Sequence, residues 1–352
     1  MKPEMREQLQ AALAGRYTLE RDLGKGGMAS VVLARDLEHD RLVALKVLHP
    51  ELAPTVGGDR FKREIRVAAK LAHPNILGVL DSGEAVASRP SSVPSESPAT
   101  NDSRLTTLLW FTMPYVEGEN VYERLQRVHQ FEPGEALRIA TAAAAALAYA
   151  HEQGVVHRDM KPDNIMLAGD EVLVADFGVA RAVSEVAEKL TATGMIVGTP
   201  TYMSPEQASG DKAIDGRSDI FGLACVLYEM LAGEPPFKGP NPQATLMRRF
   251  MGPPRPLRPL VPVAEHVESA IMRALAKDPD ERFATAGEFA DALAGRASAG
   301  LNATQMIKRA PAPEPTPAPA AAGAAKRGCA GMLAVGAGLG WAAAHLVRAV
   351  LG

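Results

Sequence analysis

Two stretches decide the fold of this sequence: His157-Arg158-Asp159-Met160-Lys161-Pro162-Asp163-Asn164 and, a short strand-rich segment later, Asp176-Phe177-Gly178. Phosphoryl transfer needs a positioned nucleophile and neutralised phosphate oxygens rather than covalent help from the protein. Asp159 can orient a hydroxyl or accept its proton, and Lys161 can meet a γ-phosphate. Asn164 and Asp176 can supply oxygen ligands to magnesium. A surface cluster of charges is the alternative interpretation, and the intact spacing of the whole set argues against it.

Upstream of this segment, a lysine lies inside the apolar run Val43-Ala44-Leu45-Lys46-Val47-Leu48. A charged group on a buried strand is costly unless it meets an anion. Two anions are available: a bound nucleotide phosphate, and Glu64 on a helix expected over 59–71. A strand lysine that points to solvent is the other reading of the same pattern.

A glycine turn, Gly24-Lys25-Gly26-Gly27, follows the first expected strand. Glycines let backbone N–H groups approach phosphate oxygens closely. An ordinary hairpin turn explains this stretch equally well when it is taken alone. It is not a Walker-type loop, because no Gly-Lys-Ser/Thr follows.

Apolar patterning divides the chain into a sheet-rich part and a helical part. Strands are expected between residues 17 and 47 and again over 105–114, whereas helices are expected over 133–153, 218–232, 263–276 and 286–294. The expected parts are an N-terminal helical extension (1–16), a small lobe (17–116) with a disordered Ser/Pro insertion (86–104), a helical large lobe (117–296), a Pro/Ala-rich linker (297–325) and an apolar C-terminal segment (326–352).

Composition excludes several classes of protein. The formal charge of −3 implies no polyanion, so no nucleic-acid partner is expected. Cys225 and Cys329 are the two cysteines, too few and too far apart for a disulfide framework or a cysteine-based zinc site. The first residues lack the apolar core of a secretory signal. A reducing compartment fits best.

Taken in order, the motifs resemble the bacterial eukaryotic-like serine/threonine protein kinases over about 17–296. The resemblance implies an α+β fold of two lobes, a small antiparallel β-sheet lobe with helix C and a larger, mainly helical lobe. It rests on Leu23-Gly24-Lys25-Gly26-Gly27-Met28-Ala29-Ser30-Val31, Ala44-Leu45-Lys46, Glu64, His157-Arg158-Asp159, Asn164, Asp176-Phe177-Gly178, Ser204-Pro205-Glu206, Asp219 and Arg282.

The resemblance also implies catalytic roles. Asp159 would be the catalytic base and Lys161 its helper, while Asn164 and Asp176 would bind the metal. Lys46 would contact the α- and β-phosphates and pair with Glu64 in the active state.

For the nucleotide, the resemblance implies a site formed by the glycine loop and the strands around it. Met113 would be the gatekeeper, and the Pro114 carbonyl and the Val116 N–H would meet the adenine. Ala29 stands where the family's third loop glycine is usual, a small replacement that still lets the loop cover the phosphates. The implied ATP-binding residues are Leu23, Gly24, Lys25, Gly26, Gly27, Met28, Ala29, Ser30, Val31, Ala44, Lys46, Met113, Pro114 and Val116.

Further residues would organise the large lobe and the activation segment. Glu206 would pair with Arg282, and Asp219 would tie the catalytic loop to the central helix. His157 and Phe177 are expected to be packing residues. Arg158 would meet a phosphothreonine at Thr191 or Thr193, and Thr199 would hydrogen-bond the catalytic aspartate.

The activity implied is that of a non-specific serine/threonine protein kinase, which transfers the γ-phosphate of Mg-ATP, with Mn²⁺ as an alternative metal, to Ser/Thr hydroxyls of proteins. Autophosphorylation in the activation loop would activate it, with a homodimer as a candidate arrangement for the trans reaction. The alternatives are a pseudokinase scaffold and a small-molecule kinase.

The apolar segment Cys329–Val347 is long enough to cross a bilayer. Lys326 and Arg327 precede it, so a single-pass anchor in the bacterial cytoplasmic membrane would leave the kinase domain in the cytoplasm. A soluble packing helix or an interfacial segment of a cytoplasmic protein is the alternative. Gly336 and Gly340 form a weak pair of small residues that could bring two copies together.

Overall fold

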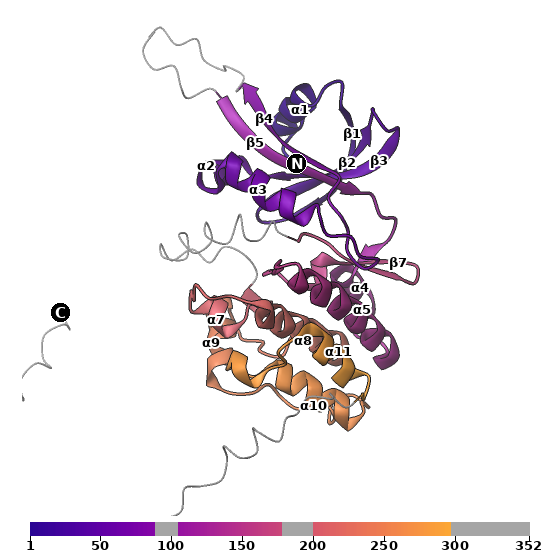
Figure 1. Ribbon diagram of the computed structural model, residues 1–352, viewed down its shortest axis with the longest axis vertical. Helices are drawn as coiled ribbons and strands as arrows, with labels where there is room; N and C mark the ends of the chain where they lie inside the picture. Colours follow the sequence, from indigo (N-terminus) through magenta and orange to yellow (C-terminus); the bar gives the residue numbers. More distant parts are fainter. Residues whose placement is uncertain (89–104, 178–199, 297–352) are drawn as a thin grey trace, which may run out of the picture. The chain divides into compact units, whose positions relative to one another are not determined.

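The computed structural model describes residues 1–88, 105–177 and 200–296, which form a sheet lobe and a mainly helical lobe (Figure 1). The two-lobed α+β fold expected from the sequence is confirmed. Within these ranges the structure has no helix long and apolar enough to span a bilayer. The expected insertion 86–104 begins too early, because residues 86–88 belong to a strand paired with residues 105–107. Residues 89–104 and the C-terminal segments lie outside the described residues.

Five antiparallel strands form the sheet of the smaller lobe, in the order β1-β2-β3-β5-β4. The register places Lys46 opposite Val31 and Phe111, and Ala44 opposite Met113. Several residues expected to meet a nucleotide therefore lie on neighbouring strands. The strands are β1 (Tyr17–Lys25), β2 (Ala29–Asp36), β3 (Arg41–Leu48), β4 (Asp81–Ser88) and β5 (Leu105–Pro114).

Helices cover both faces of this sheet, because alternate strand residues point to opposite faces and both sets are apolar. On one face, α1 (Pro3–Ala12) and the residue just after it contribute Leu9 and Leu13 to an apolar cluster with the strands. On the other, α3 (Gly58–Ala68) contributes Phe61 and Ile65 to a second cluster. The connection from β3 to α3 contains the 3₁₀ turn η1 (Pro50–Leu52) and the short helix α2 (Ala53–Val56).

The helix α3 ends at Ala68, earlier than the position 71 expected from the apolar pattern. Its last turn tightens, with Lys70 N–H donating to the Val67 carbonyl and Leu71 N–H to the Ala68 carbonyl. Such tight three-residue bonds commonly close a helix. The apolar residue Leu71 is buried, but it belongs to the turn after the helix.

The larger lobe is built on two helices with little polar surface, α5 (Pro133–Glu152) and α8 (Gly216–Ala232). Most residues of α8 are buried on every side, as expected for a central helix. It begins two residues before the expected start at 218, because the Asp215 carboxylate caps it by accepting the Arg217 N–H. It ends at Gly233, whose φ of 76° suits the left-handed C-terminal cap.

The remaining elements of this lobe surround these helices or lie beside the catalytic loop. A three-stranded sheet has the order β6-β7-β8. The elements are β6 (Glu119–Asn120), β7 (Ile165–Ala168), β8 (Glu171–Val174), α4 (Val121–Val128), α7 (Pro205–Ala208), α9 (Pro242–Met251), α10 (Glu265–Ala274), α11 (Ala286–Leu293), and the 3₁₀ turns η2 (Pro162–Asn164), η3 (Pro200–Tyr202) and η4 (Pro279–Glu281).

Candidate active site

The carboxylate of Asp219, near the start of α8, fixes the backbone of the catalytic loop. Asp219 accepts the His157 N–H at 2.8 Å and the Arg158 N–H at 2.7 Å, and its side chain is buried. Arg158 has a φ of 67°, a conformation that is uncommon for a residue with a side chain. The two hydrogen bonds to Asp219 offset the cost of that conformation and fix the residue that follows, Asp159.

The carboxylate of Asp159 lies within a small polar group. Lys161 Nζ donates to Asp159 Oδ2 at 2.5 Å. Asn164 Nδ2 donates to the Asp159 carbonyl at 2.7 Å and to Oδ2 at 3.3 Å. The Asp159 side chain is about half exposed (48%), so a substrate hydroxyl has access to it. Burial alone would lower the pKa of Lys161, but the adjacent Asp159 carboxylate raises it, which keeps the ammonium charged.

Asp176 forms an ion pair with the Lys46 ammonium of β3. Burial alone would raise the pKa of Asp176, yet the positive charge of Lys46, reinforced by His157 and Lys161, holds it below its ordinary value. Its other oxygen, Oδ1, is buried and accepts no hydrogen bond. Asp176 also has a positive φ of 68°. A strained backbone and an unpartnered buried oxygen are the features of a residue kept for a ligand.

These oxygens fit a divalent metal. Asn164 turns its amide nitrogen toward Asp159, so its amide oxygen is the atom left for a cation. The Ala175 N–H donates to the Asn164 carbonyl at 2.9 Å, which ties this residue to the segment that carries Asp176. No cluster of three His, Cys, Asp or Glu ligands occurs within the described ranges. The oxygens of Asn164 and Asp176 suit an ion such as Mg²⁺, which is commonly bound by few protein oxygens and takes further ligands from phosphate.

Glu64, the other predicted partner of Lys46, is buried on α3 (7% exposed). The Lys46 ammonium donates to the Asp176 carboxylate in this structure, and the pairing of Lys46 with Glu64 stays a prediction.

Apolar side chains expected around the adenine belong to one cluster. Ala44 and Met113 are buried in it, and Leu23, Val31 and Val116 are half-buried against it. Leu173 of β8 packs on the same cluster, although its sequence context gave no signal for a nucleotide site. Pro114 pairs with Val43 at the end of β5.

The glycines of the β1–β2 turn are not required by packing within the protein. A side chain at Gly24 or Gly27 would meet no atom within 4 Å, and the one at Gly26 would only touch the Ala29 carbonyl at 3.6 Å. None of the three has a positive φ. Space kept open above a backbone turn suits a ligand that approaches it closely, such as a phosphate. Lys25 of β1 pairs with Ser30 of β2 beside this turn, and Met28 of the turn packs on the apolar cluster.

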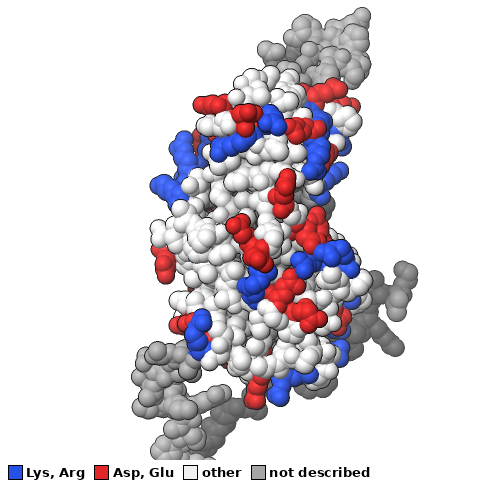
Figure 2. Space-filling view, turned by 90° about the vertical axis from the view of Figure 1, so that its right-hand side faces the viewer, with Lys and Arg blue, Asp and Glu red and all other residues white. Residues whose placement is uncertain are grey.

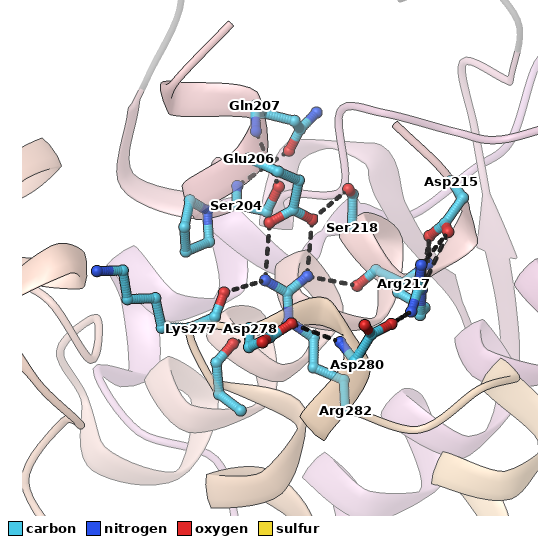
Figure 3. A network of polar contacts seen from close by, with 12 residues as sticks. Ser204, Glu206, Gln207, Asp215, Arg217, Ser218, Lys277, Asp278, Asp280 and Arg282 are labelled. Carbon is cyan, nitrogen blue, oxygen red and sulfur yellow. Dashed lines mark hydrogen bonds and ion pairs between the residues drawn. The ribbon is translucent and has the colours of Figure 1, made fainter. Parts of the chain in front are cut away.

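The predicted brace of the large lobe is present as a buried ion pair, shown in Figure 3. Both Arg282 terminal nitrogens donate to the two Glu206 oxygens at 2.7 Å, and Ser218 donates to the same carboxylate. Arg282 also donates to the carbonyls of Arg217 and Lys277, among others. Burial alone would raise the pKa of Glu206, but the Arg282 guanidinium lowers it.

Several supporting residues gave no sequence signal. His151 of α5 lies 2.8 Å from the Asp219 carboxylate, and the Gln207 amide donates to the Arg158 carbonyl at 2.8 Å. These two contacts join residues far apart in the chain, so spacing alone could not reveal them. The His157 and Phe177 rings, which were expected to be packing residues, lie edge to face with 4.7 Å between their centroids. Gly178, Thr191, Thr193 and Thr199 lie outside the described residues.

Fold and site together place this chain among two-lobed phosphotransferase domains. The protein kinase domain matches residues 17–292, and the chain belongs to the protein kinase family.

Relatives of this chain include bacterial serine/threonine-protein kinases. It is 40% identical over 285 residues to serine/threonine-protein kinase PknB of Mycobacterium tuberculosis (strain ATCC 25618 / H37Rv), covering 79% of this chain and 42% of that protein. It is 37% identical over 285 residues to the probable serine/threonine-protein kinase CE0033 of Corynebacterium efficiens, and the match covers 79% of this chain and 41% of that protein. The chain thus spans less than half the length of these curated relatives.

Among solved structures, the kinase domain of M. tuberculosis PknI is similar, with a TM-score of 0.59 and 34% identity. The similarity covers 80% of this chain and 96% of the PknI domain.

Proposed function

We propose that this chain is a serine/threonine protein kinase that transfers the γ-phosphate of Mg-ATP to protein hydroxyls. The observation that carries the proposal is the linked group of Lys46, Asp159, Asn164 and Asp176, joined through the contacts described above. Family membership and the relatives' names support the same activity.

Each of these side chains has a distinct task. The Asp159 carboxylate accepts the proton of a serine or threonine hydroxyl and aims its oxygen at the phosphorus. Lys161, next to it, neutralises phosphate charge as the bond forms. Lys46 binds the α- and β-phosphates of the nucleotide. Asn164 and Asp176 hold Mg²⁺, or Mn²⁺, which when bound neutralises charge on the phosphate oxygens.

Protein substrates are part of the proposal. Lys161 and the Ser204-Pro205-Glu206 segment are the sequence features that favour serine and threonine of proteins over tyrosine or small molecules. Acidic and basic side chains are interspersed on the face shown in Figure 2. This face carries no large field of a single sign, which would favour a polyanion.

Incubation with labelled ATP, Mg²⁺ and a generic basic protein tests the activity. Label on the basic protein or on the chain itself supports the proposal. Nucleotide binding without any transfer would indicate a pseudokinase scaffold, and label found only on a metabolite would indicate a small-molecule kinase. A Lys46→Met variant is the control for contaminating kinases.

Activation by phosphorylation at Thr191 and Thr193 also belongs to the proposal, with Arg158 as the phosphate partner. The double variant Thr191→Ala, Thr193→Ala should lose most of its rate on the basic protein, and an unchanged rate would contradict the idea. Mixing wild type with a tagged Asp159→Asn chain tests the trans reaction between two copies. Because the tagged chain cannot phosphorylate itself, label on it would support transfer from one copy to another, and its absence would contradict the trans reaction.

A membrane anchor at 326–352 is the last part of the proposal, supported by the apolar run and the basic residues before it. Carbonate extraction of membranes from cells that express the full chain tests it. Retention in the membrane pellet supports a spanning helix, and release into the soluble fraction contradicts one.

A further inference from the structure

The larger lobe buries two arginines, and they have very different surroundings. Arg282 and Arg249 are each only 2% exposed. Arg282 has the carboxylate of Glu206 as a bidentate partner. Arg249, in the last turn of α9, forms no ion pair with any Asp or Glu of the described ranges, and its Nε and Nη1 have no hydrogen-bond partner.

A buried cation without a counter-charge is costly for folding. Taking a charge out of water is offset only by an opposite charge and by complete hydrogen bonding. Burial lowers the pKa of Arg249, which shows that its surroundings disfavour the charged form. An apolar side chain of similar length would fill the same space at lower cost. Stability alone therefore does not explain an arginine at this position.

Among the described residues, the hydrogen bonds that Arg249 donates go to the turn η3. Its Nη2 donates to the Pro200 carbonyl and, at 3.5 Å, to the Thr201 carbonyl. The same turn is fixed from the other side by Tyr202, whose hydroxyl donates to Glu229 at 2.6 Å. A guanidinium suits the contact with Pro200 and Thr201, because its terminal Nη2 carries two N–H groups that can reach two neighbouring carbonyl oxygens.

The turn η3 borders the catalytic loop. Tyr202 and the next residue, Met203, line a small cavity of about 30 Å³ that is also lined by Asp159. A Cβ atom at Gly222 of α8 would lie 2.9 Å from Met160 and 3.5 Å from the Tyr202 carbonyl oxygen. The catalytic loop and η3 therefore both pack on α8 at Gly222. A polypeptide that brings a hydroxyl to Asp159 must therefore pass close to η3.

We propose that Arg249 is a positioning residue for the protein substrate: it fixes the backbone of η3 beside Asp159 and so sets how tightly the polypeptide docks. The inference rests on the proposed kinase activity. Arg249 acts through the carbonyls of Pro200 and Thr201 and touches neither the nucleotide nor the reacting atoms. The arginine is retained at a cost in stability because docking depends on it.

Three variants of α9 separate this role from a purely structural one. Arg249→Met removes the hydrogen bonds and keeps the bulk of the side chain. Arg249→Lys keeps the charge and one donor group. Arg248→Met changes the exposed neighbouring arginine and is the matched control. Each is measured for KM and kcat with a threonine-containing peptide, for KM of ATP, for melting temperature, and for hydrogen exchange over residues 200–204.

For Arg249→Met we expect the KM of the peptide to rise about tenfold or more, the effect of losing charge-assisted hydrogen bonds. The KM of ATP and kcat at saturating peptide should stay within about twofold, because the nucleotide site is untouched. The melting temperature should be unchanged or higher. Exchange of the Met203 amide, which donates to the Pro200 carbonyl, should become faster. Arg249→Lys should be intermediate, and Arg248→Met should behave as wild type.

A structural role gives a different pattern. If Arg249→Met fails to fold, or lowers the melting temperature while KM of ATP and kcat change with the KM of the peptide, the inference is wrong. It is equally wrong if the KM of the peptide is unchanged. Failure of the proposed activity is distinguishable, because wild type would then transfer no phosphate. In that case the exchange rate over 200–204 and the melting temperature alone decide whether Arg249 holds η3 at a cost in stability.

Discussion

At the scale of single residues, Asp176 concentrates the features of a ligand-binding carboxylate. One oxygen receives the Lys46 ammonium, and the other is buried without a partner. Its pKa lies below the ordinary value despite burial, so the carboxylate stays ionised at neutral pH. An ionised oxygen with no donor near it is ready for a cation.

Replacement of Asp176 by Asn should therefore weaken metal binding in the presence of ATP. We expect the affinity for Mn²⁺, measured by electron paramagnetic resonance, to fall by at least about tenfold, as for other changes around metal ligands. Asp170→Asn, at an exposed position in the turn before β8, is the control and should bind as wild type. Equal Mn²⁺ affinity in Asp176→Asn and wild type would mean that Asp176 is not a ligand.

The ion pair of Glu206 and Arg282 matters for stability in a pH-dependent way. The pKa of Glu206 in the folded protein lies below the ordinary 4.5. Its contribution is thus fully present above that value and is lost as the pH falls through the lower, folded pKa. Glu206→Gln leaves the Arg282 charge buried and unpaired, which costs about 3–5 kcal/mol at neutral pH.

Denaturant unfolding of wild type and Glu206→Gln at a series of pH values measures both effects. We expect the difference in free energy of unfolding to be large at pH 7 and to shrink as the pH falls below the ordinary pKa of glutamate. Ser209→Ala, on the turn just after α7, serves as a control. A difference independent of pH would show that charge is not the source of the stabilisation.

At the scale of elements, α1 stands out because it covers one face of the small-lobe sheet. Leu9 is fully buried there among strand residues that include Trp110. The sequence predicted a short helix at this end of the chain, but its apolar residues gave no indication of which surface they cover. Packing between segments far apart in the sequence decides that, and single-sequence patterns do not contain it.

Leu9→Ala should lower the free energy of unfolding by about 2–5 kcal/mol, the usual cost of a large cavity in a core. Glu7→Ala, on the exposed side of the same helix, should have little effect. Guanidinium unfolding followed by circular dichroism measures both. A Leu9→Ala variant as stable as Glu7→Ala would show that α1 is not part of the core of the small lobe.

At the scale of the whole molecule, the sequence predicted the residues of the active site better than it predicted the packing that supports them. The segments around Asp159 and Asp176 have fixed local spacings, so the fold and family followed from them and are confirmed. Arg249 was not predicted, because a basic residue on a helix ordinarily lies in solvent. Its burial becomes visible only when α9 packs against η3.

The most direct test of the account compares Asp159→Asn with wild type for two separate properties. Binding of Mg-ATP, measured by calorimetry, should remain within about threefold, since Asp159 meets the hydroxyl rather than the nucleotide. Phosphate transfer to protein should fall by about a hundredfold to ten-thousandfold, the range for loss of a general base. Undiminished transfer in Asp159→Asn would contradict the central claim that this carboxylate activates the substrate hydroxyl.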